Sequence, residues 1–376
     1  MRILALNCGS SSLRCAVIDT DSGRRIAERH EELGGRDHET ILQEWTHAWS
    51  RSECDEIEGL EAVGHRVVHG GESFQDASIL TEESLDRLAA LSPLAPLHNP
   101  ANIAGIRAMK EAFPALPQVA VFDTAFHHTL PPHAYLYALP FDLYQEHGIR
   151  RYGFHGISHR SAARMARKRL GLEAGNSRIL VAHLGNGCSA SAIRNGRSID
   201  TTMGATPLEG LVMGTRSGNI DPGLFSTIAQ ARKTHLDGVT DLLNRESGLL
   251  GLSGLSSDMR ELEAAALRGH AGALRAIEVF TYRLAKTLAS LVVPLGGLDG
   301  LVFTGGIGEN SAEIRKRTVD WLAPLGLAID AERNAVHGAQ DLGLLHSGGG
   351  TPVLVVASDE EASIAGETAE ALAGQD

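Results

Sequence analysis

The chain opens with the sequence RILALNCGSSS at residues 2–12, where a short apolar run leads into small, hydroxyl-bearing residues. The pattern returns at residues 178–189 as RILVAHLGNGCS. Each copy continues into a second strand-like run and a tight-turn dipeptide, Ser22-Gly23 or Asn195-Gly196. A P-loop or dinucleotide-binding turn would lead directly into a helix here. A single Gly-Ser turn more often only joins two strands, but the repetition predicts two β-hairpins whose loops hold a polyphosphate from both sides.

Composition limits the class of protein. A chain of 376 residues suggests two domains of ordinary size. Its net charge of −12 argues against nucleic acid or an anionic membrane as the main partner, so local basic residues must hold an anionic substrate. The four cysteines, Cys8, Cys15, Cys54 and Cys188, form no C-x-x-C pair, and reduced thiols in a cytoplasmic protein fit them best. The N-terminal apolar stretch is too short for a signal peptide, and we expect no membrane span.

Strand-like runs alternate with helical patterns, which indicates α/β layering. Asn99 is expected to cap a helix that begins at Pro100, and Ser158 to cap another. An apolar stripe over residues 274–291 favours a buried helix face, although it could also serve a dimer interface. A C-terminal helix over residues 361–373 is expected to return and pack on the first domain.

A third glycine loop, FTGGIGEN at residues 303–310, follows a strand and precedes a helical sequence, which suits close approach to a nucleoside. Polar residues also end or interrupt several apolar runs. Asp123 ends one of them, Arg66 lies inside another, and Arg216 lies in a loop between glycines. Charged residues in apolar runs are seldom left unpaired, so Arg66 points to a functional site.

Two histidines lie beside glycine loops, where they could donate hydrogen bonds to phosphate oxygens: His155 and His183. His155 and His159 have the i, i+4 spacing of a zinc-protease helix but lack its glutamate, so the sequence argues against a zinc site.

Several segments resemble the acetate kinase family and occur in the family's order over nearly the whole chain. They are the loops at residues 7–12, 183–187 and 303–310, and the segments GHRVVHGG at 64–71, YGFHG at 152–156, TPLEG at 206–210 and MGTRSG at 213–218. The family belongs to the superfamily of acetate and sugar kinases, heat-shock ATPases and actin. The resemblance therefore implies an α/β fold with a duplicated actin-like ATPase core, in which two domains of mixed sheet with flanking helices enclose a cleft. It places an N-terminal domain at residues 1–150, completed by the C-terminal helix 360–376, and a nucleotide-binding domain at residues 151–359.

The resemblance also implies an activity, which is reversible phosphoryl transfer between ATP and acetate that gives ADP and acetyl phosphate. It implies Mg²⁺, with Mn²⁺ as a substitute, in a cytoplasmic homodimer. Acetate is already a nucleophile at neutral pH, so positioning and charge neutralisation can suffice for direct in-line transfer.

The roles carried over by resemblance fall into four groups. The catalytic residues would be Arg66, Asp123, His155 and Arg216, with Arg66 and Arg216 holding the acetate carboxylate and the phosphoryl group. The methyl pocket would be Val68, Leu97, Phe154 and Pro207, next to Arg66. The metal would lie at Asn7 and Glu360. ATP would be bound by Ser10, Ser12, Arg14, His183, Asn186, Gly187, Asp258, Met259, Arg260, Gly306, Ile307 and Asn310.

Two positions depart from the family pattern. Arg14 stands where lysine is usual, and Asn219 where aspartate is usual. Arg14 keeps the charge but not the compact ammonium geometry, so phosphate affinity is expected to differ.

Three alternatives remain open. The first is the same phosphoryl transfer with propionate or butyrate as the acceptor. The volume of the pocket decides between these acids, and Val68 favours acetate over the longer ones. The second is a non-catalytic, chaperone-like ATPase of the superfamily, which would need a substrate-binding module and no pair of arginines. The third is a sugar kinase, whose neutral hydroxyl acceptor would call for a carboxylate base.

Overall fold

The structure is a computed structural model of the chain, and it describes residues 1–9, 12–36, 38–51, 57–96, 98–346 and 348–374. The chain forms two compact units. Unit 1 comprises Met1–His128, Gly156–Ser158 and Asp359–Asp376, and unit 2 comprises Thr129–His155 and His159–Ser358. These units divide the chain by compactness, and the functional domain limits expected at residues 150 and 151 stay a prediction.

Unit 1 is built on a six-stranded mixed sheet in the order β3-β2-β1-β4-β6-β5. Strand β1 pairs antiparallel with β2 and parallel with β4, and β4 pairs parallel with β6. The strands are β1 (Arg2–Cys8), β2 (Ser12–Asp19), β3 (Arg24–Glu32), β4 (Ala62–Val67), β5 (Ser78–Ile79) and β6 (Gln118–Phe122). The helices are α1 (His38–Arg51), α2 (Glu82–Ala90), η1 (Ser92–Leu94), α3 (Asn99–Ala112) and α15 (Glu360–Ala373), and η2 (Ala125–Thr129) ends where unit 2 begins.

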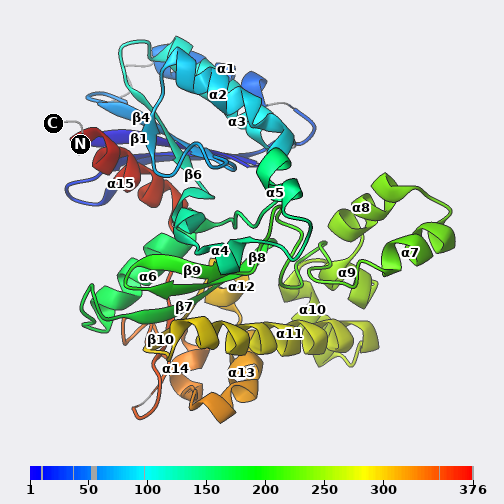
Figure 1. Cartoon of the computed structure of the whole chain (residues 1–376). Helices are drawn as coiled ribbons and strands as arrows, with labels where there is room; N and C mark the ends of the chain where they lie inside the picture. The colour runs from blue at the N-terminus through cyan, green and yellow to red at the C-terminus, as the bar shows by residue number, and fades with distance from the viewer. Residues whose placement is uncertain (10–11, 37, 52–56, 97, 347, 375–376) are drawn as a thin grey trace. The chain divides into compact units, whose positions relative to one another are not determined.

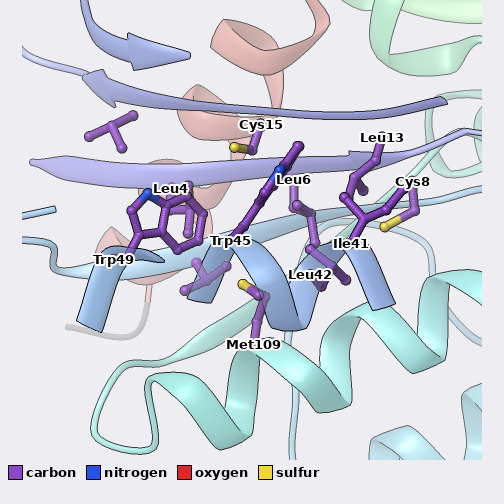
Figure 2. Packing of buried hydrophobic residues seen from close by; sticks show 12 residues of the cluster. Leu4, Leu6, Cys8, Leu13, Cys15, Ile41, Leu42, Trp45, Trp49 and Met109 are labelled. Atoms are coloured by element: carbon purple, nitrogen blue, oxygen red, sulfur yellow. The ribbon is translucent and has the colours of Figure 1, made fainter. Parts of the chain in front are cut away.

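Alternate residues of β1 fill two different cores, because successive side chains of a strand point to opposite faces. Leu4, Leu6 and Cys8 pack with Trp45 of α1 and Met109 of α3 on one face, as Figure 2 shows. On the other face Ile3 and Ala5 pack with Ile364 and Ala365 of α15. Figure 1 shows this helix lying beside β1. The C-terminal helix therefore completes the core of the sheet that contains the N-terminus.

Unit 2 contains a five-stranded mixed sheet in the order β11-β10-β7-β8-β9. Its strands are β7 (Arg178–Leu184), β8 (Cys188–Arg194), β9 (Arg197–Thr201), β10 (Gly300–Thr304) and β11 (Val353–Val355). Helix α11 (Ala271–Leu295) packs on β7, β8 and β9, and against α9 (Gly248–Ser253), α10 (Met259–Leu267) and α13 (Ala312–Trp321). The other helices are α4 (Pro132–Tyr135), α5 (Asp142–His147), α6 (Gly156–Arg169), which begins in unit 1, α7 (Leu224–Arg232), α8 (Leu236–Arg245), α12 (Gly305–Asn310), η3 (Ala323–Leu325) and α14 (Ala331–Ala335).

The two sheets repeat one topology. The order β3-β2-β1-β4-β6 matches β9-β8-β7-β10-β11, with the same parallel and antiparallel pairings. The strand pairs β2-β3 and β8-β9 also have a register shift each, at Val17/Ile18 and at Ala192/Ile193. These pairs lie opposite Ile3-Leu4 and Ile179-Leu180, the same positions of the repeated RIL sequence. The predicted duplicated α/β core of two mixed sheets with flanking helices is confirmed.

Two expectations about helix starts were wrong. Helix α3 begins at Asn99 itself, and the Asn99 side chain bonds to the backbone of His69 rather than capping the helix. Helix α6 begins at Gly156, so Ser158 lies inside it. The stripe on α11 is largely core: Ile277, Leu284, Leu288 and Leu291 are buried, whereas Leu274 is exposed. Within the described part of the chain, no helix combines the length and apolar character that crossing a membrane requires.

The packing of α15 on β4 depends on the absence of a side chain at Gly64. A Cβ atom there would lie 2.2 Å from Thr368 Oγ1 and 3.0 Å from Ile364 Cγ2. We expect Gly64→Ala to lower the free energy of unfolding by about 1–3 kcal/mol, the usual cost of overpacking. Gly366 of the same helix has no atom near its Cβ position, and Gly366→Ala should be neutral or stabilising by up to about 1 kcal/mol. Calorimetric melting of both variants measures this, and equal midpoints would contradict it.

Candidate active site

Unit 1 brings four of the predicted site residues into one network around Arg66. Arg66 lies on β4, Asn7 near the end of β1, Asp123 directly after β6 and Glu360 at the start of α15. Arg66 donates to Asp123 Oδ2 from Nε at 3.1 Å and from Nη2 at 2.7 Å. Arg66 Nη1 donates to Asn7 Oδ1 at 3.0 Å and lies 3.6 Å from Glu360 Oε2, to which Asn7 Nδ2 donates at 2.7 Å.

The network keeps the Arg66 guanidinium protonated at the carboxyl ends of the parallel strands, between the carboxylates of Asp123 and Glu360. Burial by itself lowers the pKa of Arg66, but the attraction of Asp123 and Glu360 raises it overall. Burial raises the pKa of Asp123, against the opposing effect of the Arg66 guanidinium. Arg66 is therefore cationic at any physiological pH and is held in one orientation, which suits the binding of an anion.

Two buried asparagines of α3 fix the backbone that follows Arg66. Asn102 accepts from Val68 N at 3.1 Å and donates to Cys8 O at 3.1 Å, so it joins the ends of β4 and β1. Asn99 accepts from His69 N at 3.2 Å and donates to His69 O at 2.9 Å. Both side chains are almost completely buried. Sequence reasoning missed these residues, although two asparagines three positions apart in an apolar helix were a visible signal.

Ser12 and Arg14, two further predicted residues of unit 1, lie on β2, the second strand of the first hairpin. Val68 is buried, and Ser12 begins β2, where its carbonyl oxygen accepts from Gly9 N at 2.9 Å. Arg14 is exposed on β2 and is the cross-strand partner of Asn7. Ser10 and Leu97 lie outside the described residues.

In unit 2 the residues beside the second hairpin meet at Ser189. Its Oγ lies 2.9 Å from His155 Nδ1 and 2.7 Å from His159 Nε2. The His183 ring lies 4.4 Å from that of His155. A Cβ at Gly187 would lie 3.3 Å from His155 Nε2 and 3.7 Å from Arg216 Nη1, so both side chains reach the Gly187 turn. The structure thus brings His155, His183, Gly187 and Arg216 together.

Arg216 has a polar environment unlike that of Arg66. Its Nη1 donates weakly to Pro207 O at 3.4 Å, and among the described residues no carboxylate forms an ion pair with it. Burial lowers its pKa. A partly buried cation without a carboxylate attracts an anion from solvent. Phe154 is buried in the same unit, and Asn186 accepts from Gly214 N at 3.0 Å in the loop that leads to Arg216.

The third glycine loop becomes helix α12, and it approaches the second hairpin closely. Gly305 has φ of 78°, and a Cβ there would lie 2.8 Å from Leu184 O. Asn310 Nδ2 donates to Gly306 O at 2.9 Å, and the surroundings of Gly306 are open. Glu309 accepts from Gly305 N, Ser358 N and Ser358 Oγ at 2.7–2.9 Å, which ties this loop to the segment after β11. Sequence reasoning gave Glu309 no role.

The predicted adenosine residues at 258–260 begin α10. Asp258 caps the helix by accepting from Arg260 N at 2.8 Å, and it also pairs with the exposed Arg260 side chain. Met259 is buried. Ser311, directly after α12, donates to Glu263 of α10. This bond places α10 beside the third glycine loop.

A buried arginine supports the third loop from behind. Arg315 of α13 is fully buried, and its Nη1 donates to Gly308 O at 2.9 Å and to Glu309 O at 2.8 Å. Its Nε and Nη2 bond to Asn334 Oδ1 and O at 2.8 and 2.9 Å, and Nη2 lies 2.9 Å from His337 Nδ1. Burial lowers the pKa of Arg315 to about 10. The last carbonyls of a short helix are otherwise unsatisfied, so Arg315 fixes α12.

Among the described residues, no group of three or more His, Cys, Asp or Glu side chains could hold a metal ion. Cys8, Cys15 and Cys188 are buried and form no disulfide, and Cys54 lies outside the described residues. Burial raises the pKa of the Cys8 and Cys188 thiols to about 12, so neither is a nucleophile at neutral pH.

Comparisons with known proteins agree with one another. The model of the Acetokinase family matches residues 27–366. An acetate kinase of Ectopseudomonas mendocina (strain ymp) is 51% identical over 97% of this chain and 98% of its own. An acetate kinase of Deinococcus deserti is 50% identical over 100% of this chain and 99% of its own.

Solved structures are similar over the whole chain as well. A propionate kinase from Francisella tularensis subsp. tularensis SCHU S4 has a TM-score of 0.90 at 42% identity, covering 97% of this chain and 98% of its own. The Porphyromonas gingivalis acetate kinase has a TM-score of 0.89 at 37% identity and covers 99% of each chain.

The contacts of Arg315 predict a large effect on stability. Arg315→Met should lower the free energy of unfolding by about 3 kcal/mol, because it leaves several buried carbonyl oxygens without a donor. Arg317 lies on the same helix, where it is partly exposed and pairs with Glu313 at 2.6 Å, so Arg317→Met should cost less than about 1 kcal/mol. Urea unfolding of the two variants measures the difference. Similar losses in both would show that Arg315 is not a structural support.

Proposed function

Because the chain belongs to the acetokinase family, we propose that it transfers a phosphoryl group reversibly between ATP and acetate, giving ADP and acetyl phosphate. The observation that carries this assignment is the network of Arg66 with Asn7, Asp123 and Glu360. A fixed guanidinium in an acidic protein suits a small anionic acceptor. A neutral sugar hydroxyl would instead need a carboxylate placed as a base.

The acceptor needs orientation more than activation. Acetate is ionised at neutral pH and is itself the nucleophile, so no residue has to remove a proton from it. Arg66 and Arg216 would neutralise the carboxylate and the transferring phosphoryl group, and Asp123 would keep Arg66 in place. His155 would donate to a phosphoryl oxygen. We propose direct in-line transfer, since an enzyme carboxylate of similar basicity would gain little as an intermediate acceptor.

The nucleotide would be held by the glycine loops. In unit 2 the Asn186-Gly187 turn lies beside His155 and Arg216, which suits phosphate. The open surroundings of Gly306 and the adjacent α10 suit the adenosine. In the first hairpin, Ser12 and Arg14 would contact phosphate oxygens.

The residues at Asn7 and Glu360 fit Mg²⁺, or Mn²⁺ in its place. An amide oxygen and a carboxylate are the hard oxygen donors that Mg²⁺ prefers. The bond from Asn7 Nδ2 to Glu360 keeps the two side chains adjacent, and Asn7 Oδ1 would exchange its bond with Arg66 Nη1 for the ion. When bound, the ion would neutralise charge on the ATP phosphates.

We further propose a cytoplasmic homodimer. Buried cysteines that form no disulfide fit a reducing compartment. Tyr282 of α11 and Trp321 of α13 are both exposed and lie edge to face at 5.2 Å, which offers an apolar surface to a second copy.

Propionate is the second candidate acceptor. The similarity to the propionate kinase structure favours it, and the pocket residues decide between the acids by their volume. Val68 and Pro207 would limit the pocket and favour acetate.

The direct test is ATP-dependent formation of acyl hydroxamate with acetate, propionate and butyrate side by side. We expect the highest kcat/KM with acetate. Higher kcat/KM with propionate would reassign the acceptor. ATP hydrolysis without any acyl phosphate would favour a chaperone-like ATPase instead.

Replacing Arg66 or Arg216 tests the proposed phosphoryl transfer most directly. Arg66→Ala and Arg216→Ala should each lower kcat by about 10² to 10⁵, the range for lost charge stabilisation in phosphoryl transfer. Two exposed arginines serve as matched controls: Arg87 donates to Ser73 O at 3.5 Å, and Arg283 donates to Asn219 O at 3.1 Å. Their alanine variants should keep kcat. Normal turnover in folded Arg66→Ala and Arg216→Ala would refute the assignment.

Val68 predicts the acceptor preference. Val68→Ala should open room for about one or two methylenes and move kcat/KM toward propionate by roughly 1 kcal/mol, or about fivefold. Val67 is also buried, but it packs in a core with Phe74 and Phe122, so Val67→Ala should cost stability without changing the ratio. An unchanged ratio in Val68→Ala would show that Val68 does not line the pocket.

A further inference from the structure

We propose that Ser189 is a positioning residue which, with His159, sets the tautomer of His155 and keeps the His155 proton on Nε2. The catalytic meaning of this inference rests on the proposed phosphoryl transfer, whereas its structural basis lies entirely within unit 2.

The side chain of Ser189 connects two imidazoles. Ser189 lies at the start of β8, opposite His183 of β7, and is completely buried, as is His159. Its Oγ is within hydrogen-bond distance of His155 Nδ1 at 2.9 Å and His159 Nε2 at 2.7 Å. A hydroxyl has one proton and two lone pairs, and among the described residues the buried Ser189 Oγ has no third hydrogen-bond partner to which it could donate. Ser189 therefore donates to one of these nitrogens and accepts from the other.

Only two orders of protons satisfy both bonds with neutral rings. In the first, His159 Nε2–H donates to Ser189, and Ser189 donates to His155 Nδ1, which leaves the His155 proton on Nε2. In the second, His155 Nδ1–H donates to Ser189, and His155 Nε2 carries a lone pair. The tautomer of His155 is therefore coupled to that of His159 through one hydroxyl.

The position of His155 Nε2 decides between the two orders. His155 Nε2 and Arg216 Nη1 both lie at the Gly187 turn, as their distances of 3.3 and 3.7 Å from a Cβ there indicate. An Nε2 lone pair at this turn would repel a phosphoryl oxygen, whereas an Nε2–H would donate to it. His183, whose ring lies 4.4 Å from that of His155, limits rotation of the ring. The first order is the one that serves phosphoryl transfer.

The backbone supports a held side chain at this position. His155 has φ of 59°, in the left-handed region that residues other than glycine adopt at a cost of about 1 kcal/mol or more. It directly precedes α6, and His159 N donates to His155 O at 2.9 Å in the first turn. Both histidines are thereby fixed on one helical turn, with Ser189 between their rings.

Long-range proton–nitrogen NMR of the full chain, labelled with ¹⁵N-histidine, tests the tautomer without any assay of activity. A His155→Asn spectrum identifies the signals of His155. We expect the proton on Nε2 in the wild-type chain and a mixture of tautomers in Ser189→Ala. Ser191 is the matched control, since it is buried on the same face of β8 and bonds to Thr201 Oγ1 at 2.9 Å. Ser191→Ala should leave the His155 signals unchanged.

Kinetics test the consequence. Ser189→Ala should lower kcat about 10- to 100-fold, as loss of an orienting hydrogen bond does, while KM for ATP stays within about twofold. Ser189→Thr retains the hydroxyl and should recover most of the loss. His159→Phe should give the same tautomer mixture as Ser189→Ala, and the double variant should be no worse than either single one.

Several results would overturn the proposal. One is a wild-type His155 with its proton on Nδ1 or on both nitrogens, and another is unchanged His155 signals in a folded Ser189→Ala. If Ser189→Ala does not fold, the wild-type spectrum and His159→Phe decide. A chain that makes no acyl phosphate but shows the expected tautomers would refute the proposed function and leave the hydrogen-bond order intact.

Discussion

The partial burial of the Arg66 guanidinium is the constraint from which the arrangement of unit 1 follows. An arginine inside an apolar strand is tolerated only with partners, and here the partners come from three other segments. Asp123 ends the neighbouring parallel strand, Asn7 lies near the end of β1, and Glu360 begins the C-terminal helix. The alternation of side chains on β1 buries one face against α1 and α3 and the other against α15, so the helix that carries Glu360 also completes the core. The charge network and the hydrophobic packing thus fix the same segments.

Steric contacts at three glycines constrain the fold as much as the charges do. Gly64 admits α15 next to β4, Gly187 leaves room for His155 and Arg216, and Gly305 lets the third loop approach the backbone of Leu184. Each of these glycines lies where a functional segment meets another segment of its own unit. The second and third glycine loops therefore need glycine for a steric reason, in addition to any contact of their N–H groups with phosphate.

The sequence predicted the parts of this protein that depend on local pattern and repetition. The repeated RIL strands and their glycine loops indicated two hairpins without a following helix, and both are present as β1-β2 and β7-β8. The strand pair that follows each hairpin has a register shift at the equivalent position. Arg66 was singled out because a charge in an apolar run requires a partner, although its partners could be named only by resemblance to a family. Asn99 was assigned to a helix cap because local rules favour an asparagine before proline, and Asn102 was given no role. Tertiary contacts with His69, Val68 and Cys8 determine the use of both side chains. Arg315 and Ser189 were missed for the same reason, since their partners are distant in sequence.

The duplication also explains how one topology supplies two kinds of chemistry. Asn7 of β1 and His183 of β7 occupy equivalent positions of the repeated strand, and their cross-strand partners are Arg14 and Ser189. In unit 1 this position joins a network of full charges, in which a guanidinium is held by carboxylates and its orientation is fixed. In unit 2 it lies beside imidazoles linked through a hydroxyl, whose protons can be ordered in two ways. Fixed charge suits the binding of an anionic acceptor, and an ordered N–H suits charge that grows only as the phosphoryl group is transferred. Because the two sheets repeat one backbone topology, the side chains at the ends of the equivalent strands are sufficient to give these positions different polar environments.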